Sequence, residues 1–463
     1  MFSPLQNVRL FFLLCVAALP FEMIISVARH QLAIRIGPVG YLLHPTFGMA
    51  VSGCFLQPHM HVGRRKWFLA FLAIYAVGLG SSGLVTGSVP FFLFSVWALG
   101  PLFMAFSIVI FADSDLLNDA IVAFVIGISI WSIVYFLFFL WTAHVIVGRF
   151  PVYNSFPFGE FMMALRSPGE DLWRELYYFR LLGNFNKQAN ILMLSLILAS
   201  YLYVEGGLSL KGWSVATMPI AIMFLLMFSR GAFVALILVA IGLLATSALV
   251  RRPIPQLSSA SIMLLIVFVS LSNATWRAYW HDQGSMVERE EMAEVAVSGS
   301  ATILKSGELV TRSSENLKSC SAREPEPTAK FFVFGYGLGN FGPSVCRGSG
   351  AETHNAFIDA WVQGGLVGFV GYTGLFVVAF TLGIFELIRS RFTNQVALFG
   401  LAVVCSIAVL GMREYALVYL WVQSAGGFLL ALGIAMIVSK NSRTNGLKVP
   451  PDTSEAGVVT VNS

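Results

Sequence analysis

Long apolar stretches separated by short polar connections run along most of the chain, up to about position 438. The stretches are about 20 residues long, the length that an α-helix needs to cross a hydrocarbon core of roughly 30 Å. We therefore predict an all-α, polytopic membrane protein with about twelve transmembrane helices. The predicted spans are 10–28, 39–57, 67–87, 90–112, 120–147, 188–204, 213–229, 231–250, 256–272, 366–388, 395–411 and 415–438.

Composition supports this interpretation. Of the 463 residues, 57% are hydrophobic and 11% are charged, whereas soluble chains carry about 25% charged residues. An ordinary soluble globular protein is thereby excluded, and we expect no nucleic-acid partner. The first apolar stretch contains Pro20 and Glu22 and lacks a small-residue cleavage site, so we interpret it as a retained helix and not as a signal peptide.

The basic residues of the short connections predict the orientation. With the N-terminus inside, the inner connections and tails carry twelve basic residues and the outer connections carry four. The positive-inside rule then places both termini in the cytoplasm. The inner residues are Arg9, Arg64, Arg65, Lys66, Lys211, Arg251, Arg252, Arg389, Arg391, Lys440, Arg443 and Lys448, and the outer ones are Arg29, Arg35, Arg230 and Arg413.

Two outer segments are too long and too polar to be simple turns, and they divide the chain. Capping boxes predict a short helix in each, beginning at Ser167 and at Ser285. The first of these helices is expected to lie along the membrane interface. The predicted parts are 1–147 (N-terminal transmembrane helices), 148–187 (outer loop with the interfacial helix), 188–272 (transmembrane helices), 273–365 (large outer loop and re-entrant helix), 366–438 (C-terminal transmembrane helices) and 439–463 (cytoplasmic tail).

Arg230 is the first candidate for chemistry, because it interrupts an apolar run at the outer boundary of two predicted spans. An arginine at this position costs desolvation free energy unless it meets an anion. Guanidinium groups match phosphate oxygens bidentately, so Arg180, Arg230 and Arg289 are candidates for a diphosphate clamp. The alternative for Arg230 is an interfacial arginine whose charged end reaches water.

His354 is the second candidate, at the start of a predicted helix 355–363. An imidazole near its ordinary pKa accepts a proton from a hydroxyl at neutral pH, although a histidine at a helix end often has only a structural role. Upstream, Gly335, Gly337 and Gly339 allow close backbone approach or positive φ. This glycine pattern does not follow a strand, so we do not interpret it as a dinucleotide site.

The cysteines and one acidic residue complete the candidates. Cys320 and Cys346 share the large outer loop, where we expect a disulfide, with two free thiols as the alternative. The other cysteines, Cys15, Cys54 and Cys405, are expected to be small core residues, and no metal-binding spacing occurs. Glu414 either pairs with the adjacent Arg413 or orients a catalytic arginine.

Three motifs in this order resemble the bacterial O-antigen ligase and polysaccharide polymerase superfamily. They are Arg180-Leu181-Leu182-Gly183, then Ser229-Arg230-Gly231, and then the glycine loop 335–341 followed by His354-Asn355-Ala356-Phe357. The resemblance covers roughly residues 180–435. One departure is that Lys187 and Asn190 stand where the family often has a Pro-Asn pair.

The resemblance implies a metal-independent, inverting glycosyltransferase with a GT-C-like membrane fold and no cofactor. Its donor would be a glycan on undecaprenyl diphosphate, and its active site would open to the periplasm at the bacterial inner membrane. Arg180 and Arg230 would hold the diphosphate, and His354 would activate the acceptor hydroxyl. Arg312 competes with Arg289 for the position of a further arginine. The predicted substrate contacts are Arg289, Gly337, Gly339, Asn355 and Glu414.

The predicted function is polymerisation of lipid-linked oligosaccharide repeat units into a cell-surface polysaccharide or exopolysaccharide. The alternative within the family is a ligase that transfers the glycan to lipid A core. From other classes, a secondary transporter or lipid-linked glycan flippase and a noncatalytic assembly protein stay open. Expected partners are the lipid-linked donor, the glycan acceptor, membrane lipids, and the flippase and chain-length regulator of the same pathway.

Overall fold

The protein is described here by a computed structural model, which covers eleven separate parts of the chain. These are residues 3–21, 25, 44–56, 63–85, 103–147, 185–227, 229–249, 253–272, 329–335, 355–412 and 424–439. Within these residues the regular structure is entirely helical, and no strand occurs. The predicted all-α class is therefore confirmed for this part of the chain.

The helices follow the apolar stretches of the sequence. Each predicted span overlaps a helix, and residues 103–111 supply the one within 90–112. The elements are α1 (Pro4–Ala18), η1 (Leu19–Phe21), α3 (Pro45–Leu56), η3 (Gly63–Arg65), α4 (Lys66–Val85), α6 (Ser114–Val147), α9 (Phe185–Val204), α10 (Leu210–Leu226), α11 (Arg230–Thr246), η5 (Ser247–Leu249), α12 (Pro253–Ser272), α15 (Ala329–Phe334), α17 (Ala356–Arg389), α18 (Gln395–Gly411) and α19 (Ser424–Val438).

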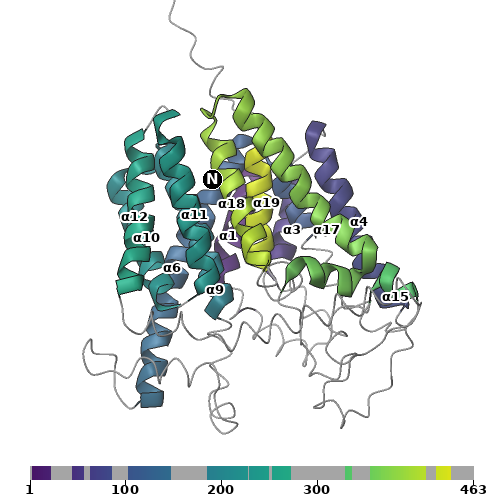
Figure 1. Cartoon of the computed structure of the whole chain (residues 1–463), viewed down its shortest axis with the longest axis horizontal. Coiled ribbons are helices and arrows are strands. Elements are labelled where there is room, and N and C mark those ends of the chain that lie inside the picture. Colours follow the sequence, from purple (N-terminus) through teal and green to yellow (C-terminus); the bar gives the residue numbers. More distant parts are fainter. Residues whose placement is uncertain are drawn as a thin grey trace, which may run out of the picture.

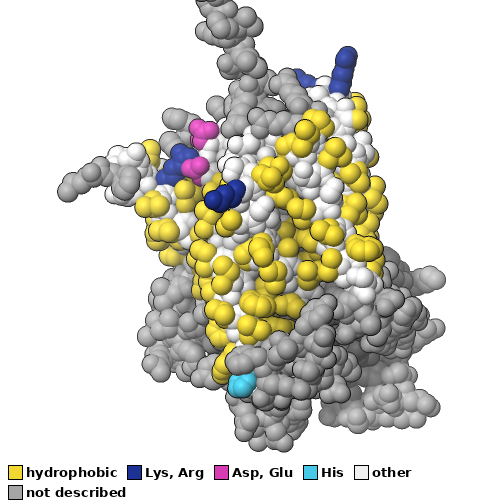
Figure 2. All heavy atoms as spheres, turned by 90° about the vertical axis from the view of Figure 1, so that its left-hand side faces the viewer, with side chains coloured by type: hydrophobic (Ala, Val, Ile, Leu, Met, Phe, Trp, Pro, Cys, Tyr) yellow, Lys and Arg dark blue, Asp and Glu magenta, His cyan; other side chains and the backbone are white. Residues whose placement is uncertain are grey.

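Five stretches in the described part of the chain are long and apolar enough to cross a membrane: Pro4–Phe21, Ser114–Trp141, Arg230–Leu249, Pro253–Ser272 and Ala356–Arg389. Hydrophobic side chains form a broad band across the described helices in Figure 2. Large apolar side chains on several helices point outward, for example Leu238 (53% exposed) and Phe268 (69% exposed). These features are those of a helical membrane protein, whose lipid-facing surface is apolar.

The helices pack side by side in a bundle, with α10, α11 and α12 on one side and α4 and α17 on the other (Figure 1). The central helix is α9, which contacts α6, α10, α11, α12, α18 and α19. Every residue from Gln188 to Leu202 on it is buried. Helices α11 and α18 therefore share one buried core with α9.

Small residues let helix backbones approach closely in this bundle. A Cβ atom added to Gly127 in α6 would lie 2.1 Å from the carbonyl oxygen of Ala17, and one added to Gly400 in α18 would lie 2.7 Å from that of Gly433. Such contacts are a usual device of membrane helices, where van der Waals packing drives association. Gly78 and Gly371 join α4 to α17 in the same way.

Helix α17 consists of two segments that meet at Gly365, where φ is 62° and ψ is −165°. This agrees with the prediction of a short helix 355–363 followed by a span that begins at 366. In Figure 1 the first segment lies across the lower end of the bundle, and the second runs up along it. The break at Gly365 therefore lets the chain turn from a segment that crosses the end of the bundle into one that runs along the bundle.

The charged side chains of the described helices are concentrated at one end of the bundle. Arg9 forms an ion pair with Asp119, Arg64 with Glu386, and Tyr201 Oη donates to Asn118 Oδ1 at 3.0 Å. These contacts tie one end together, which we call the inner end. The predicted inner residues that are described all belong to it: Arg9, Arg64, Arg65, Lys66, Lys211, Arg389 and Arg391. Charged side chains gather in the upper half of Figure 2.

The opposite end, which we call the outer end, holds the starts of α9, α11 and α17 and the end of α18. Arg230 lies there. The grouping of basic residues thus agrees with the predicted topology, while the direction of the bundle in the membrane stays a prediction.

Some local predictions need correction. Helix α6 begins at Ser114 and not near 120, because Asp113 Oδ1 accepts a hydrogen bond from Leu116 N at 2.7 Å and caps the helix. Helix α10 begins at Leu210, after an N-cap at Ser209. Cys54 is exposed instead of lying in the core, whereas Cys15 and Cys405 are partly buried.

Candidate functional site

The Ser-Arg-Gly motif forms the N-terminus of α11. Ser229 is the N-cap, and its Oγ accepts a hydrogen bond from Ala232 N at 3.5 Å. Arg230 is the first helical residue and is partly buried. The N-terminus of a helix carries a partial positive charge, so the guanidinium group and the helix end both favour an anion. The predicted turn is confirmed, but Gly231 does not make it, because this glycine already lies in the first turn of α11.

The His-Asn motif leads into α17. Asn355 is the N-cap, and its Oδ1 accepts hydrogen bonds from Phe357 N at 3.0 Å and Ile358 N at 3.2 Å. Its Nδ2 donates to the carbonyl oxygen of Met412 at 3.2 Å. Asn355 therefore begins one helix and binds it to the end of α18. This gives the side chain a structural task beside the substrate contact that the sequence predicts.

The end of α18 connects the two motifs. A Cβ atom added to Gly231 would lie 3.6 Å from Leu410 Cδ2, and one added to Gly411 would lie 3.4 Å from Ala356 Cβ. Two successive residues of α18 thus contact the start of α11 and the start of α17. Arg230 and Asn355, which are far apart in the sequence, consequently share the outer end of the bundle.

Gly335, the first residue of the glycine loop, contacts α17 directly after the end of α15. Gly335 follows α15 and has a φ of 76°, one of the conformations that glycine allows at this position. A Cβ atom added to Gly335 would lie 2.5 Å from Gly365 N, so its backbone lies directly against the break in α17. Trp361 also joins the two elements, since its Nε1 donates to the carbonyl oxygen of Phe332 at 3.4 Å.

A buried carboxylate lies behind the start of α17, and the sequence analysis did not single it out. Asp359 is 1% exposed, one turn after Asn355. Tyr75 on α4 and Tyr372 on α17 are buried as well, with ring centroids 5.5 Å apart. A single acidic residue inside the apolar sequence Ala356–Val362 was the available signal, because such a residue is expensive to bury without a purpose.

Eight of the predicted site residues lie outside the described residues, so their assignments stay predictions. They are Arg180, Arg289, Cys320, Gly337, Gly339, Cys346, His354 and Glu414. The helices predicted to begin at Ser167 and Ser285 also fall outside. Two predicted site residues are described, and the structure places both at the outer end of the bundle. They are Arg230 and Asn355.

The described residues form no candidate metal site. Within the described ranges, no group of three or more His, Cys, Asp and Glu side chains could hold a metal ion. Among the described residues, the outer end provides polar groups at the Arg230 helix start and in the Asn355–Asp359 turn. The first suits an anion, and the second fixes the geometry of a helix end.

Comparison with known proteins adds no family. No protein-family model matches the chain, and no curated protein matches it either. The only support for the candidate site is therefore the chemistry and arrangement of its own residues.

Proposed function

We propose that this chain is a membrane glycosyltransferase that transfers a glycan from undecaprenyl diphosphate to an acceptor hydroxyl at the outer end of its bundle. The proposal rests on the three motifs in the sequence and on the location of two of them. The chain would span the bacterial inner membrane about twelve times in a GT-C-like arrangement, with both termini in the cytoplasm.

One observation carries the proposal. The starts of α11 and α17, which bear the Ser-Arg-Gly and His-Asn motifs, both contact the last turn of α18 at Leu410 and Gly411. A diphosphate-binding group and an acceptor-activating group have to lie near each other to act on one substrate. The meeting of these two helix starts supports such a pairing.

The chemistry assigns a role to each motif. His354 takes the proton of the acceptor hydroxyl, and the acceptor oxygen attacks the anomeric carbon of the donor sugar from the side opposite the diphosphate. The bond between that carbon and the diphosphate oxygen breaks, so the configuration inverts. Arg180 and Arg230 stabilise the negative charge that develops on the leaving diphosphate. Arg289, Gly337, Gly339 and Glu414 are proposed as further substrate contacts.

The charge distribution favours an enzyme over a transporter. In the described helices, every Asp, Glu, Lys and Arg lies within the first or last two turns, including Arg230 and Asp359 at the outer end. Coupled transporters usually bind their ions and substrates near the middle of the membrane. The transporter or flippase function is therefore the second choice.

Within the enzyme class we propose a polymerase that joins lipid-linked repeat units, with the O-antigen ligase as the alternative. The large outer segment 273–353 and the absence of obvious sequence features for docking a core oligosaccharide favour the polymerase. The acceptor in that case is a second lipid-linked repeat unit.

The test is transfer by purified protein in lipid nanodiscs. Wild type, His354→Ala, Arg230→Ala and the matched inner-end variant Arg389→Ala are incubated with undecaprenyl-diphosphate glycan and either acceptor. Arg389 suits this purpose because its side chain is 67% exposed at the end opposite to Arg230. The readouts are released undecaprenyl diphosphate and the size of the glycan product.

The proposal expects release by wild type and Arg389→Ala, and loss of release in the two outer-end variants while they remain folded. A ladder of products with the lipid-linked acceptor indicates a polymerase, and a single transfer to lipid A core indicates a ligase. Folded wild type that releases nothing with either acceptor would contradict the enzyme and favour the transporter.

A further inference from the structure

The first segment of α17, residues 356–364, is held at both ends and along its buried side. At its start, Asn355 Nδ2 donates to the carbonyl oxygen of Met412 at 3.2 Å. Along its buried side it packs on α4, where a Cβ atom added to Gly364 would lie 3.4 Å from the carbonyl carbon of Gly78. At its far end, it meets the backbone of Gly335. The segment is thus fixed to α18, to α4 and to the residue that follows α15.

The contact at the far end is made by two glycines and leaves no room for a side chain on either. A Cβ atom added to Gly335 would lie 2.5 Å from Gly365 N and 2.7 Å from the carbonyl carbon of Gln363. One added to Gly365 would lie 2.0 Å from the carbonyl oxygen of Val333. Real Cβ atoms essentially never approach other atoms within 3.0 Å, so these backbones touch only because both residues are glycine.

Backbone conformation is a second, independent reason for glycine at these positions. Gly365 has a φ of 62° and a ψ of −165°, a region that is essentially closed to residues with a side chain. Gly335 has a φ of 76°, which also favours glycine. Alanine at either position is therefore opposed both by the contact and by the local conformation.

This contact fixes the far end of the segment 356–364, whose start follows the Asn355 cap. We propose that Gly335 and Gly365 form a clamp that positions the start of α17 for the transfer reaction. The inference rests on the proposed function, and it makes both glycines positioning residues, because neither offers a group that reacts.

The size of the effect follows from the demands of catalysis. A displacement of about 1 Å in a catalytic group lowers a rate about 100-fold. Relief of the clash at Gly365 requires a shift of that order, because the added Cβ atom at 2.0 Å falls about 1 Å short of the closest approach that is normally seen. The clamp therefore predicts a fall in kcat and little change in donor binding.

The experiment compares Gly365→Ala and Gly335→Ala with the matched control Gly127→Ala. Gly127 makes an equally close backbone contact, 2.1 Å from the carbonyl oxygen of Ala17, but it joins α6 to α1. Each protein is assayed in nanodiscs with undecaprenyl-diphosphate glycan, and kcat and KM are measured separately per folded molecule. Hydrogen exchange of the amides in 356–364 is measured in parallel.

We expect kcat to fall about 100-fold in both clamp variants, with the KM of the donor within about threefold of wild type. Gly127→Ala is expected to keep its kcat within about threefold, and exchange in 356–364 is expected to speed up only in the clamp variants. If Gly365→Ala does not fold, Gly335→Ala serves alone, since that residue lies outside α17.

Two results overturn the clamp: clamp variants that keep the wild-type kcat, and an equal loss of kcat in all three variants, which would indicate general destabilisation. Wild type that releases no undecaprenyl diphosphate is a different result. It overturns the proposed function itself, together with the role of the clamp in that reaction.

Discussion

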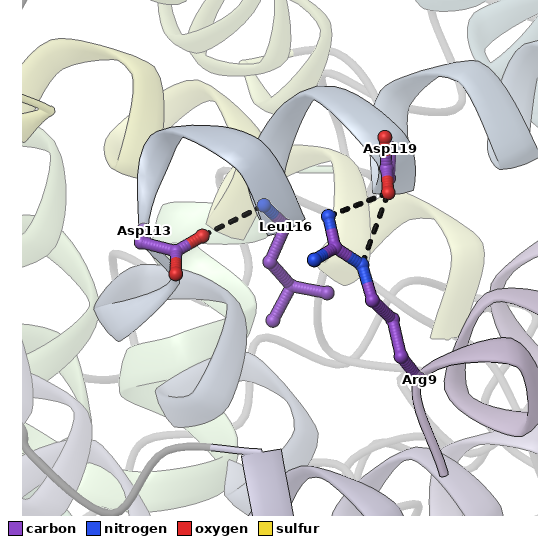
Figure 3. Close-up of polar contacts among 4 residues, drawn as sticks. All are labelled: Arg9, Asp113, Leu116 and Asp119. Carbon is purple, nitrogen blue, oxygen red and sulfur yellow. Dashed lines mark hydrogen bonds and ion pairs between the residues drawn. The ribbon is translucent and has the colours of Figure 1, made fainter. Parts of the chain in front are cut away.

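The two ends of the bundle are held together by different means. At the inner end, the Arg9 Nε and Nη2 atoms both donate to Asp119 Oδ2, at 3.1 and 2.6 Å (Figure 3). Arg64 pairs with Glu386, and Arg65 Nη1 donates to the carbonyl oxygen of Phe111 at 2.7 Å. At the outer end, the described contacts include the Ser229 and Asn355 caps, a buried carboxylate and a pair of glycine backbones.

This difference separates stability from geometry. Ion pairs between partly exposed side chains contribute roughly 0–1 kcal/mol each and adapt to small shifts. Burial lowers the pKa of the Arg65 guanidinium, and the carboxylate of Asp113 acts in the opposite direction, but arginine stays protonated in proteins. Backbone contacts between glycines tolerate almost no displacement. The inner end can therefore vary its charges, whereas the outer end is built to keep positions fixed, as a reaction site requires.

The largest effect is expected from a change of geometry at constant charge. Arg230→Lys keeps the positive charge but loses the planar fork that binds two phosphate oxygens. We expect transfer to fall about 100-fold, since loss of one oriented donor to a developing negative charge costs about 10²- to 10³-fold. Arg389→Lys at the inner end is the matched control and should keep full activity. Equal activity of the two variants would remove the distinction between the ends.

The next effect concerns stability alone. Gln256 is fully buried, and its Nε2 donates to the carbonyl oxygen of Leu243 at 2.8 Å and to Thr246 Oγ1 at 2.7 Å, which joins α11 to α12. Gln256→Leu leaves these acceptors without the amide and should lower the unfolding free energy by roughly 1–3 kcal/mol. Thermal unfolding in nanodiscs measures the loss. The kcat per folded molecule should not change, and a parallel fall in kcat would show that the inner end also sets the site geometry.

Two N-caps allow a direct comparison between the ends. Asn355 caps α17 at the outer end and Ser209 caps α10 at the inner end, where its Oγ accepts from Gly212 N at 3.2 Å. Replacement of either by alanine should cost about 1 kcal/mol of stability. Only Asn355→Ala should also lower kcat, by about tenfold, because it frees the start of α17 from Met412. Similar kinetics for both variants would argue against a special role of the outer cap.

The smallest effect is expected for the ion pair in Figure 3. The side chains of Arg9 and Asp119 are 40% and 46% exposed. A double-mutant cycle with Arg9→Ala and Asp119→Ala should give a coupling energy below about 1 kcal/mol, smaller still at high salt. Transfer activity should be unchanged. A coupling well above this value would show that charge pairs hold the inner end as firmly as glycines hold the outer end.

The locations of the helices were predictable from the sequence because each one follows an apolar stretch, whatever it packs against. Helix starts were less so. Asp113 and Ser209 are polar and lie outside the apolar windows, yet they cap α6 and α10 and extend both helices beyond the predicted starts. Helix starts were predicted from capping residues only in the long outer segments, at Ser167 and Ser285.

The candidate site was predictable where one residue carries its own signal. Arg230 was conspicuous because it interrupts an apolar run, and the predicted helix 355–363 and the predicted span from 366 left a gap at the position of the break. The contacts of Gly335 with Gly365 and of Asn355 with Met412 join positions far apart in the chain. No local pattern encodes such pairs. Asp359 was missed for a related reason, since its burial depends on the packing of α17 against other helices.

Helix α6 has a consequence for the membrane itself. Its apolar stretch Ser114–Trp141 has 28 residues, which rise about 42 Å at 1.5 Å per residue. A hydrocarbon core of roughly 30 Å is too thin to cover this length. In Figure 1 the helix reaches beyond the lower ends of its neighbours. The mismatch has to be relieved by tilt of α6 or by a thickened ring of lipid around it, so the thickness of the surrounding bilayer becomes part of what holds this side of the protein in place.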